Sequence, residues 1–304
     1  MIAGGSGAVG RLFSARLRES GAEVCTIDPA PATGLPDGCR PLRGDITGPG
    51  PREISELATA DLVLLAVPEP VAVRALPALA GVLRPGVLLA DTLSVKRPMA
   101  DAQAVLGPEV QTVGLNPMFA PALGFPGRPV AAVVGRDGER ARELLRLVSS
   151  WGARVVPLTA ERHDRITAAS QALTHAAVLS FGLALQALDT DLAELAAVAP
   201  PPHTALLALL ARIVSGTPEV YWDVQAGNPG AEAARTALAD AAAGLGSLVR
   251  NEDRAGFDAL LTRLAERFGP DLDGHRAVCA ALFERLAPTG GPAPATPAPL
   301  PGTT

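Results

Sequence analysis

A glycine-rich hexapeptide near the start of the chain has the spacing of a phosphate-binding turn. It consists of Gly5, Ser6, Gly7, Ala8, Val9 and Gly10. A short apolar run precedes it, and an amphipathic stretch with Leu12, Phe13 and Leu17 follows. In a G-x-G-x-x-G turn the glycines permit close approach to a pyrophosphate, and the helix N-terminus offers free N–H groups to it. A tight strand-to-helix turn without a ligand is the alternative.

A carboxylate then ends the next apolar run. Asp28 lies about 20 residues after the last glycine, where a carboxylate can bind the hydroxyls of a ribose. The same charge repels a 2′-phosphate. We therefore expect a dinucleotide cofactor, and NAD in preference to NADP.

Polar side chains also follow two consecutive predicted strands. The segment from Asp91 to Lys96 reads D-T-L-S-V-K, and the segment from Leu115 to Pro121 reads L-N-P-M-F-A-P. Ligands of open α/β sheets bind beyond the carboxyl ends of the strands, so both segments are candidates for chemistry. Alternatively, Ser94 caps a helix and Asn116-Pro117 is an ordinary turn.

The elements that must position these residues are predicted from the hydrophobic pattern. The first 160 residues alternate short apolar runs with amphipathic stretches, which is typical of a parallel sheet with covering helices. The expected strands are residues 1–3, 23–27, 62–67, 87–90, 112–115, 129–134 and 154–157. The first is short, so either residues precede Met1 or the domain tolerates a short strand.

Helical patterns dominate after Thr159, with a break at the prolines of residues 200–202. We expect a nucleotide-binding domain over residues 1–158 and a helical domain over residues 159–287. The proline-rich segment 288–304 should be disordered, because it has almost nothing to bury.

Composition excludes several classes of function. The net charge of -5 gives no basic surface for nucleic acid, and the three cysteines have no metal-binding spacing. We expect a soluble, cytoplasmic protein with a small-molecule substrate, no metal, and no nucleic-acid or membrane partner.

The two polar segments resemble signatures of prephenate dehydrogenases, the D-x-x-S-V-K and H-P-M-F-G-P loops. The passages Trp151 to Arg154, His163-Asp164 and Gln171 to His175 are similar in order and spacing. The resemblance covers roughly residues 1–270. It implies an α/β fold, with an N-terminal Rossmann-like parallel-sheet domain and an all-α dimerisation domain. It also implies a homodimer that transfers hydride from ring C4 of a cyclohexadienyl dicarboxylate to NAD while the ring carboxylate leaves as CO2.

The resemblance further implies roles for residues of the helical half. His175 would line the substrate pocket, beside Gln171, and Arg212 would hold a substrate carboxylate. Asp164, Gln171 and His175 have helical spacing for one face. A structural histidine and a structural ion pair of Arg212 are the alternatives, although a buried arginine on an apolar helix needs an anion. Lys96 either binds a carboxylate or orients its loop, and a structural role is favoured for His163.

One departure from the family pattern bears on the substrate. Asn116 stands where the motif has a histidine, which takes the proton of the C4 hydroxyl as hydride leaves. An amide is not basic, but a C4 amine needs no such base because its lone pair can expel hydride directly. We therefore expect oxidative decarboxylation of 4-amino-4-deoxyprephenate to 4-aminophenylpyruvate, as in antibiotic precursor synthesis, with Ser94 and Asn116 around the C4 substituent. Prephenate or arogenate dehydrogenase is the first alternative, and a non-catalytic nucleotide-sensing dimer the second.

Overall fold

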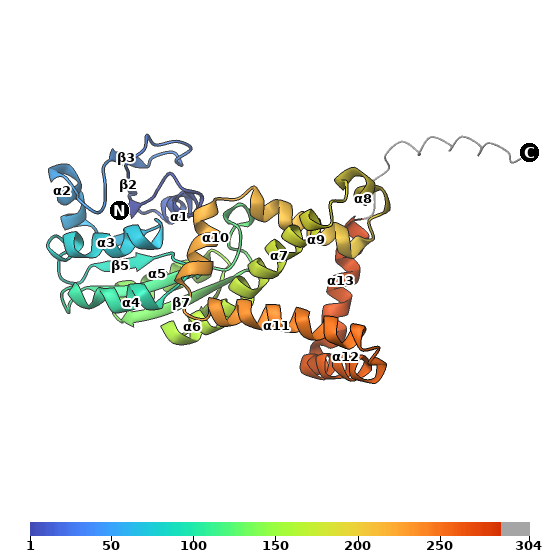
Figure 1. Cartoon of the computed structure of the whole chain (residues 1–304). Helices are drawn as coiled ribbons and strands as arrows, with labels where there is room; N and C mark the ends of the chain where they lie inside the picture. Colours follow the sequence, from blue (N-terminus) through green and yellow to red (C-terminus); the bar gives the residue numbers. More distant parts are fainter. Residues whose placement is uncertain (287–304) are drawn as a thin grey trace, which may run out of the picture. The chain divides into compact units, whose positions relative to one another are not determined.

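The computed structural model describes residues 1–286 (Figure 1). The chain divides into two compact units. The first comprises residues 1–176 and 217–238, and the second comprises residues 177–216 and the chain from residue 239. The last strand ends at Pro157 and helices follow from Ala160, but the first unit also includes two helical segments that the sequence predicts in the second domain. The predicted disorder of 288–304 lies outside the described residues.

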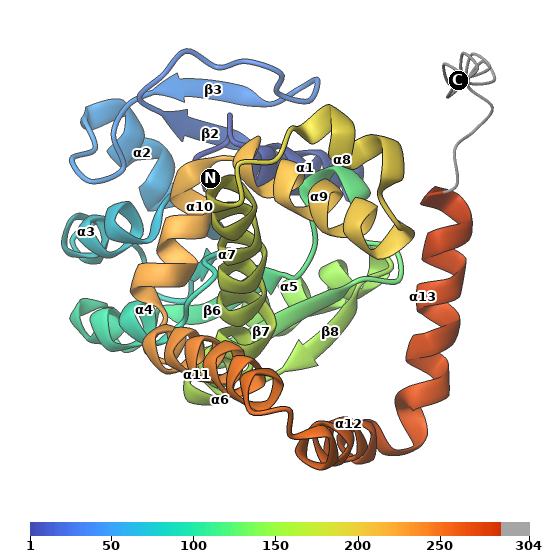
Figure 2. The ribbon, with the colours of Figure 1, turned by 45° about the vertical axis from the view of Figure 1, so that its right-hand side comes forward.

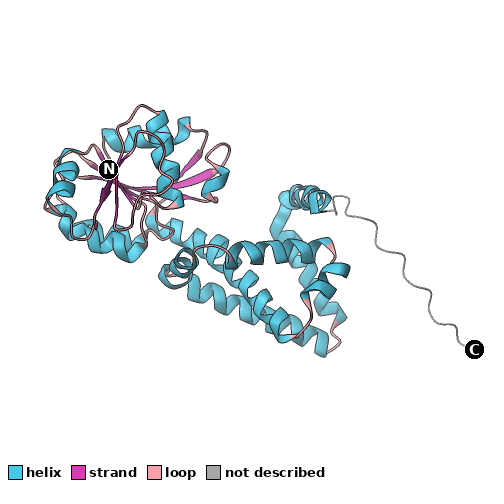
Figure 3. Cartoon of the chain, turned by 90° about the horizontal axis from the view of Figure 1, so that it is seen from above, coloured by secondary structure: helices cyan, strands magenta, loops and turns pink. Residues whose placement is uncertain are grey.

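An eight-stranded sheet forms the centre of the first unit, and its order is β3-β2-β1-β4-β5-β6-β7-β8. The strands are β1 (Ile2–Ala3), β2 (Cys25–Asp28), β3 (Arg40–Arg43), β4 (Leu62–Leu65), β5 (Leu88–Asp91), β6 (Gln111–Pro117), β7 (Pro129–Arg136) and β8 (Arg154–Pro157). Figure 3 shows that strands are confined to this unit. The central strands β4 and β5 are almost continuously apolar because helices cover both of their faces.

Helices on the two faces of the sheet bury separate apolar clusters (Figure 2). One face packs Phe13 of α1 (Ala8–Glu19) and Leu144 of α5 (Glu139–Ser150). The other packs α2 (Pro51–Thr59), α3 (Glu69–Ala80) and α4 (Arg97–Ala102) through residues such as Leu57, Leu76 and Met99. Short 3-10 turns, η1 (Gln103–Val105) and η2 (Pro121–Leu123), complete the connections.

Two features of the sheet correct the sequence prediction. Strand β7 runs antiparallel to β6, so the sheet is mixed and not wholly parallel. The loop between these strands holds only a 3-10 turn, and a parallel return would need a longer crossover. Strand β3, which pairs with β2 at the sheet edge, was missed because its sequence, R-P-L-R, is largely exposed and has no apolar run.

A long helical run links the two units. It begins with α6 (Ala160–Thr167), passes through a π-helical turn, η3 (Ala168–Ala172), and continues as α7 (Leu173–Ala187). The remaining helices are α8 (Leu192–Val198), α9 (Pro201–Val214), α10 (Pro218–Trp222), the π-helical turn η4 (Asp223–Gly227), α11 (Ala231–Arg250), α12 (Arg254–Phe268), η5 (Gly269–Asp271) and α13 (Leu272–Leu286). In the second unit Gly182 lets α7 and α9 approach closely, since a Cβ there would lie 2.8 Å from the side chain of Leu210.

Among the described residues, one helical run, Ala160–Ala187, is long and apolar enough to span a membrane by length and composition. Core helices of soluble proteins pass the same test. Its first turn carries Glu161 and Arg162, and the next residues, His163 and Asp164, are buried in a polar network of the first unit. The run is therefore weak evidence for a membrane span.

Candidate active site

The glycine loop between β1 and α1 is shaped for close backbone approach. A Cβ on Gly10 would lie 2.1 Å from the carbonyl oxygen of Gly4, so only glycine fits there. The loop is held by Asp28, whose Oδ2 accepts a 2.8 Å hydrogen bond from the backbone N–H of Ser6. No side chain caps the N-terminus of α1 at Gly7, which leaves its N–H groups to a ligand. These residues fit a dinucleotide, whose ribose Asp28 would bind.

A buried ion pair supports the end of β5. Lys96 Nζ donates to Asp91 Oδ1 at 2.5 Å and to the carbonyl oxygen of Leu115 at 2.7 Å. Burial lowers the pKa of the Lys96 ammonium, and the carboxylate of Asp91 opposes that shift. Gly114 makes room for the pair, since a Cβ there would lie 2.8 Å from Lys96 Cδ. The pair ties the D-T-L-S-V-K loop to β6.

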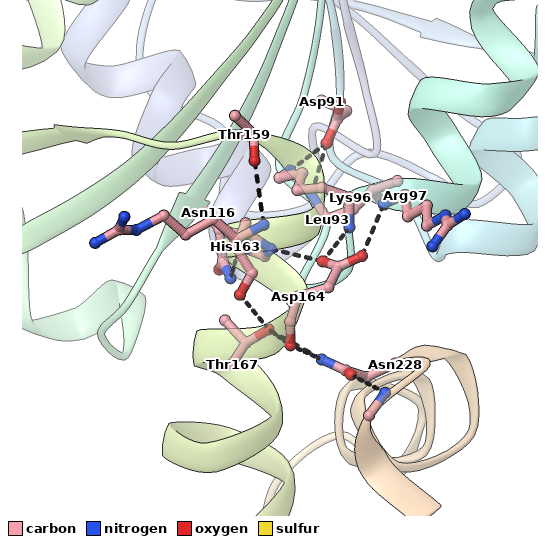
Figure 4. A network of polar contacts seen from close by, with 12 residues as sticks. Asp91, Leu93, Lys96, Arg97, Asn116, Thr159, His163, Asp164, Thr167 and Asn228 are labelled. Carbon is pink, nitrogen blue, oxygen red and sulfur yellow. Dashed lines mark hydrogen bonds and ion pairs between the residues drawn. The ribbon is translucent and has the colours of Figure 1, made fainter.

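A chain of three side chains leads from this loop to the end of β6 (Figure 4). Asp164 accepts hydrogen bonds from the backbone N–H groups of Lys96 at 2.8 Å and Arg97 at 2.9 Å. Its Oδ1 also lies 2.7 Å from His163 Nδ1, and His163 Nε2 lies 3.0 Å from Asn116 Nδ2. Burial raises the pKa of Asp164, but the hydrogen bonds from His163, Arg97 and Lys96 outweigh it, so the pKa lies below its usual value.

Asn228 fixes the helix that carries this chain. Its Nδ2 donates to the carbonyl oxygen of Asp164 at 2.9 Å and to Thr167 Oγ1 at 3.0 Å. Helix α6 begins at an N-cap, Thr159, whose hydroxyl accepts from the N–H of Arg162. Asn228 lies between η4 and α11, more than 60 residues away in sequence, and only the fold brings it here.

Comparisons with known proteins assign the chain to a family. Residues 41–131 match the prephenate dehydrogenase nucleotide-binding domain, and residues 159–263 match the dimerization domain of the same family. The chain is 54% identical, over 94% of its length and 96% of the relative, to a 4-amino-4-deoxyprephenate dehydrogenase of Streptomyces pristinaespiralis. It belongs to the prephenate dehydrogenase family.

Two further matches are more distant in sequence. It is 32% identical to the T-protein of Haemophilus influenzae over 74% of its own residues and 55% of that protein. The crystal structure of prephenate dehydrogenase from Aquifex aeolicus, in complex with hydroxyphenyl propionate and NAD+, superimposes with a TM-score of 0.69 at 20% identity. The superposition covers 88% of this chain and 96% of the Aquifex chain. It confirms the fold, a Rossmann-like domain followed by helices.

The structure brings together two of the residues predicted from the family signatures. Asn116, which the sequence predicts in a loop, lies within β6 opposite Ala131. Asn116 and Lys96 are both buried around the carboxyl ends of β5 and β6. Ser94 lies at the bend between β5 and α4 and is half-buried. It is not a helix cap, because the N-cap of α4 is Lys96. The ammonium of Lys96 is held by Asp91, which favours the loop-orienting alternative.

The predicted residues of the helical half are placed differently from the expectation. The π-helical turn η3 interrupts the regular helical spacing that predicts Asp164, Gln171 and His175 on one face. Gln171 Oε1 is buried without a hydrogen bond to any described residue, and His175 packs edge-on against Tyr221 with ring centroids 5.0 Å apart. Arg212, in the last turn of α9, is exposed, so the cost of a buried charge does not argue for a carboxylate there.

Sequence reasoning missed the contacts of His163 and Asn228. The sequence favours a structural role for His163, yet this residue contacts Asn116, the side chain at the position of the motif histidine. The adjacent acidic residue, Asp164, was the available signal, since a carboxylate that binds one nitrogen of an imidazole sets the role of the other. No sequence signal identified Asn228.

Proposed function

We propose that this protein oxidatively decarboxylates 4-amino-4-deoxyprephenate to 4-aminophenylpyruvate with NAD as the cofactor. The observation that carries the proposal is a buried amide, Asn116, at the place where the family motif has a basic imidazole. The 54% identity to a 4-amino-4-deoxyprephenate dehydrogenase supports the same substrate.

The chemistry balances without a base at position 116. When NAD is bound, its nicotinamide accepts the hydride from C4 of the substrate. The lone pair of the C4 amine replaces the electrons of the broken C–H bond and forms an iminium ion. The ring carboxylate then leaves as CO2, and the electron pair of its C–C bond completes the aromatic ring and neutralises the iminium. The product is an aniline, and the amine nitrogen loses no proton during these steps.

The chain's own residues would bind and orient the substrate. Ser94 and Asn116 serve as hydrogen-bonding groups around the C4 substituent, and His175 and Gln171 shape the pocket. Arg212, an exposed residue, would hold one substrate carboxylate, as the family resemblance implies.

We also infer a homodimer formed through the helical unit. Large apolar side chains of that unit are exposed in the single chain, which is typical of a surface covered by a partner. They include Leu183, Leu188, Val198, Val214 and Val278.

Among the described residues, His163 gives a specific observation in favour of the prephenate alternative, because it puts an imidazole 3.0 Å from Asn116. However, its two ring nitrogens contact Asn116 and Asp164, and the residue is fully buried. A histidine engaged in this way is poorly placed to take a proton from a hydroxyl on the far side of Asn116.

An assay of NADH formation with prephenate, arogenate and aminodeoxyprephenate tests the proposal. We expect the largest kcat/KM for the amino substrate. An equal or larger kcat/KM for prephenate overturns the substrate assignment, and no NADH with any of the three overturns catalysis itself.

A further inference from the structure

We infer that His163 and Asp164 are positioning residues that fix the amide of Asn116 with its carbonyl oxygen directed to the reacting substituent, so that the site selects an N–H donor over a hydroxyl. The orientation of the amide follows from the hydrogen-bond geometry and the negative charge of Asp164. The choice between amine and hydroxyl rests on the proposed function.

The first step concerns the proton on His163 Nδ1. An ionised carboxylate can only accept hydrogen bonds, and Asp164 already accepts from two backbone N–H groups. Its pKa lies below the usual value, so it is ionised near neutral pH. The 2.7 Å contact between Asp164 Oδ1 and His163 Nδ1 therefore requires an N–H on Nδ1.

The second step passes from the imidazole to the amide. Asn116 Nδ2 lies 3.0 Å from His163 Nε2, and an amide NH2 group can only donate a hydrogen bond. Nε2 must therefore be the acceptor, so the ring carries its single proton on Nδ1 and Asn116 turns its NH2 group, and not its oxygen, to the ring. His163 is 0% exposed and Asn116 2% exposed, so water is largely excluded as an alternative partner.

The third step concerns the other end of the amide. No hydrogen bond between described residues uses Asn116 Oδ1, and this oxygen is not among the fully enclosed side-chain atoms that lack a partner. It is therefore the polar atom that Asn116 can offer to a ligand. Rotating the amide by half a turn would present its NH2 group to the ligand. This rotation breaks the hydrogen bond to His163 and leaves the lone pair of Nε2 facing the amide oxygen.

A hydrogen-bond acceptor fixed at this point distinguishes the two substrates during oxidation. A C4 amine keeps its N–H groups as it becomes an iminium, and its growing positive charge strengthens a hydrogen bond to Oδ1. A C4 hydroxyl must lose its single proton as it becomes a carbonyl, after which two oxygen acceptors face one another. The hydrogen bond to Oδ1 thus lasts through the whole oxidation of the amine, whereas for the hydroxyl it ends when the proton is lost, and an amide oxygen is not basic enough to take that proton.

Long-range 1H–15N correlation spectra of the protein without substrate test the orientation directly. The chain has four histidines, and a His163→Phe variant assigns the signal of His163. We expect a neutral ring with the proton on Nδ1 and an unprotonated Nε2, and a shift away from this tautomer in Asp164→Asn. A proton on Nε2 in the unmodified protein overturns the inference.

The ratio of kcat/KM for aminodeoxyprephenate to kcat/KM for prephenate tests the selection. We expect this ratio to fall about tenfold or more in both Asp164→Asn and His163→Phe, because the amide is then free to rotate. Thr167→Val is the matched control, since Thr167 is buried on the same helix but does not touch the His163 ring nitrogens. Thr167→Val should lower kcat/KM for both substrates by the same factor. An unchanged ratio in a folded Asp164 or His163 variant overturns the selection.

These results separate the inference from the proposed function. If the unmodified protein prefers prephenate, the proposed substrate is wrong, while the tautomer in the substrate-free spectrum still decides the orientation of Asn116. If the protein prefers the amine but the variants keep the same ratio, the substrate stands and selection by His163 and Asp164 fails.

Discussion

Lys96 Nζ lies 2.5 Å from Asp91 Oδ1, with the two side chains 2% and 1% exposed. Removing one partner of such a pair leaves a buried charge without compensation, so Lys96→Met should lower the free energy of unfolding by about 3–5 kcal/mol. The double variant Asp91→Leu/Lys96→Met should recover much of this loss. Urea unfolding of the unmodified protein, the single variant and the double variant measures these free energies. A stable Lys96→Met protein with only a raised KM would instead indicate that Lys96 binds the substrate.

The depressed pKa of Asp164 predicts a stability change in acid. Because its pKa is lower in the folded state than the usual 3.8, the unfolded chain binds the proton first as pH falls. The stabilisation by Asp164 is therefore complete well above pH 3.8 and is lost as pH falls through the folded pKa. The difference in unfolding free energy between the unmodified protein and Asp164→Asn should be largest near pH 7 and shrink below about pH 4. A difference independent of pH would show that the carboxylate is not the stabilising group.

Asn116→His should restore a base at the position of the family histidine. An imidazole there can donate one N–H to His163 Nε2 and direct its other nitrogen to the C4 hydroxyl. We expect kcat/KM for prephenate to rise about tenfold or more and kcat/KM for the amino substrate to fall. Asn116→Ala, which supplies no base, should lower both. A gain for prephenate in the alanine variant would contradict the role given to the imidazole.

Asp28 should decide between NAD and NADP. Asp28→Ala removes both the charge and the hydrogen bond to the Ser6 N–H, and should raise the KM for NAD about tenfold. Asp28→Asn is the matched control, because its Oδ1 can still accept from Ser6 while the charge that repels a 2′-phosphate is gone. It should keep more NAD affinity and admit NADP. Continued exclusion of NADP by both variants would contradict the charge argument.

Arg212→Ala should raise the KM for the substrate by roughly 10- to 100-fold while the Kd for NAD stays the same. The side chain is exposed, so its removal should change the melting temperature little. Isothermal titration with NAD and steady-state kinetics separate the two effects. A loss of NAD affinity, or a large fall in melting temperature, would point to a structural arginine.

Most of the fold could be predicted because its signals are local. Buried central strands read as apolar runs, and the glycine turn is recognisable from spacing. Strand β3 could not be predicted, since an exposed edge strand owes its place to pairing with β2 and not to its own side chains. The direction of β7 depends on the length of a connection, and the π-helical turn at residues 168–172 has no apolar pattern that distinguishes it from a regular helix.

The site was only partly predictable because its contacts join distant segments. The motif residues Lys96 and Asn116 could be identified from their resemblance to known loops. The atoms through which they form hydrogen bonds could not be predicted, because these depend on the positions of Asp91, His163 and Asp164 in the folded chain. The buried position of Asn116 and the exposure of Arg212 were likewise consequences of packing.

The two hydrogen bonds donated by Asn228 have a consequence for how the protein is made. They hold the helix of Asp164 from a point 64 residues further along the chain. While the ribosome is still synthesising the intervening helices, the sheet can already be complete, but Asp164 and Thr167 lack this support. The catalytic geometry should therefore be the last part of the first unit to mature, and a nascent chain released before residue 228 should bind nucleotide without turning over substrate.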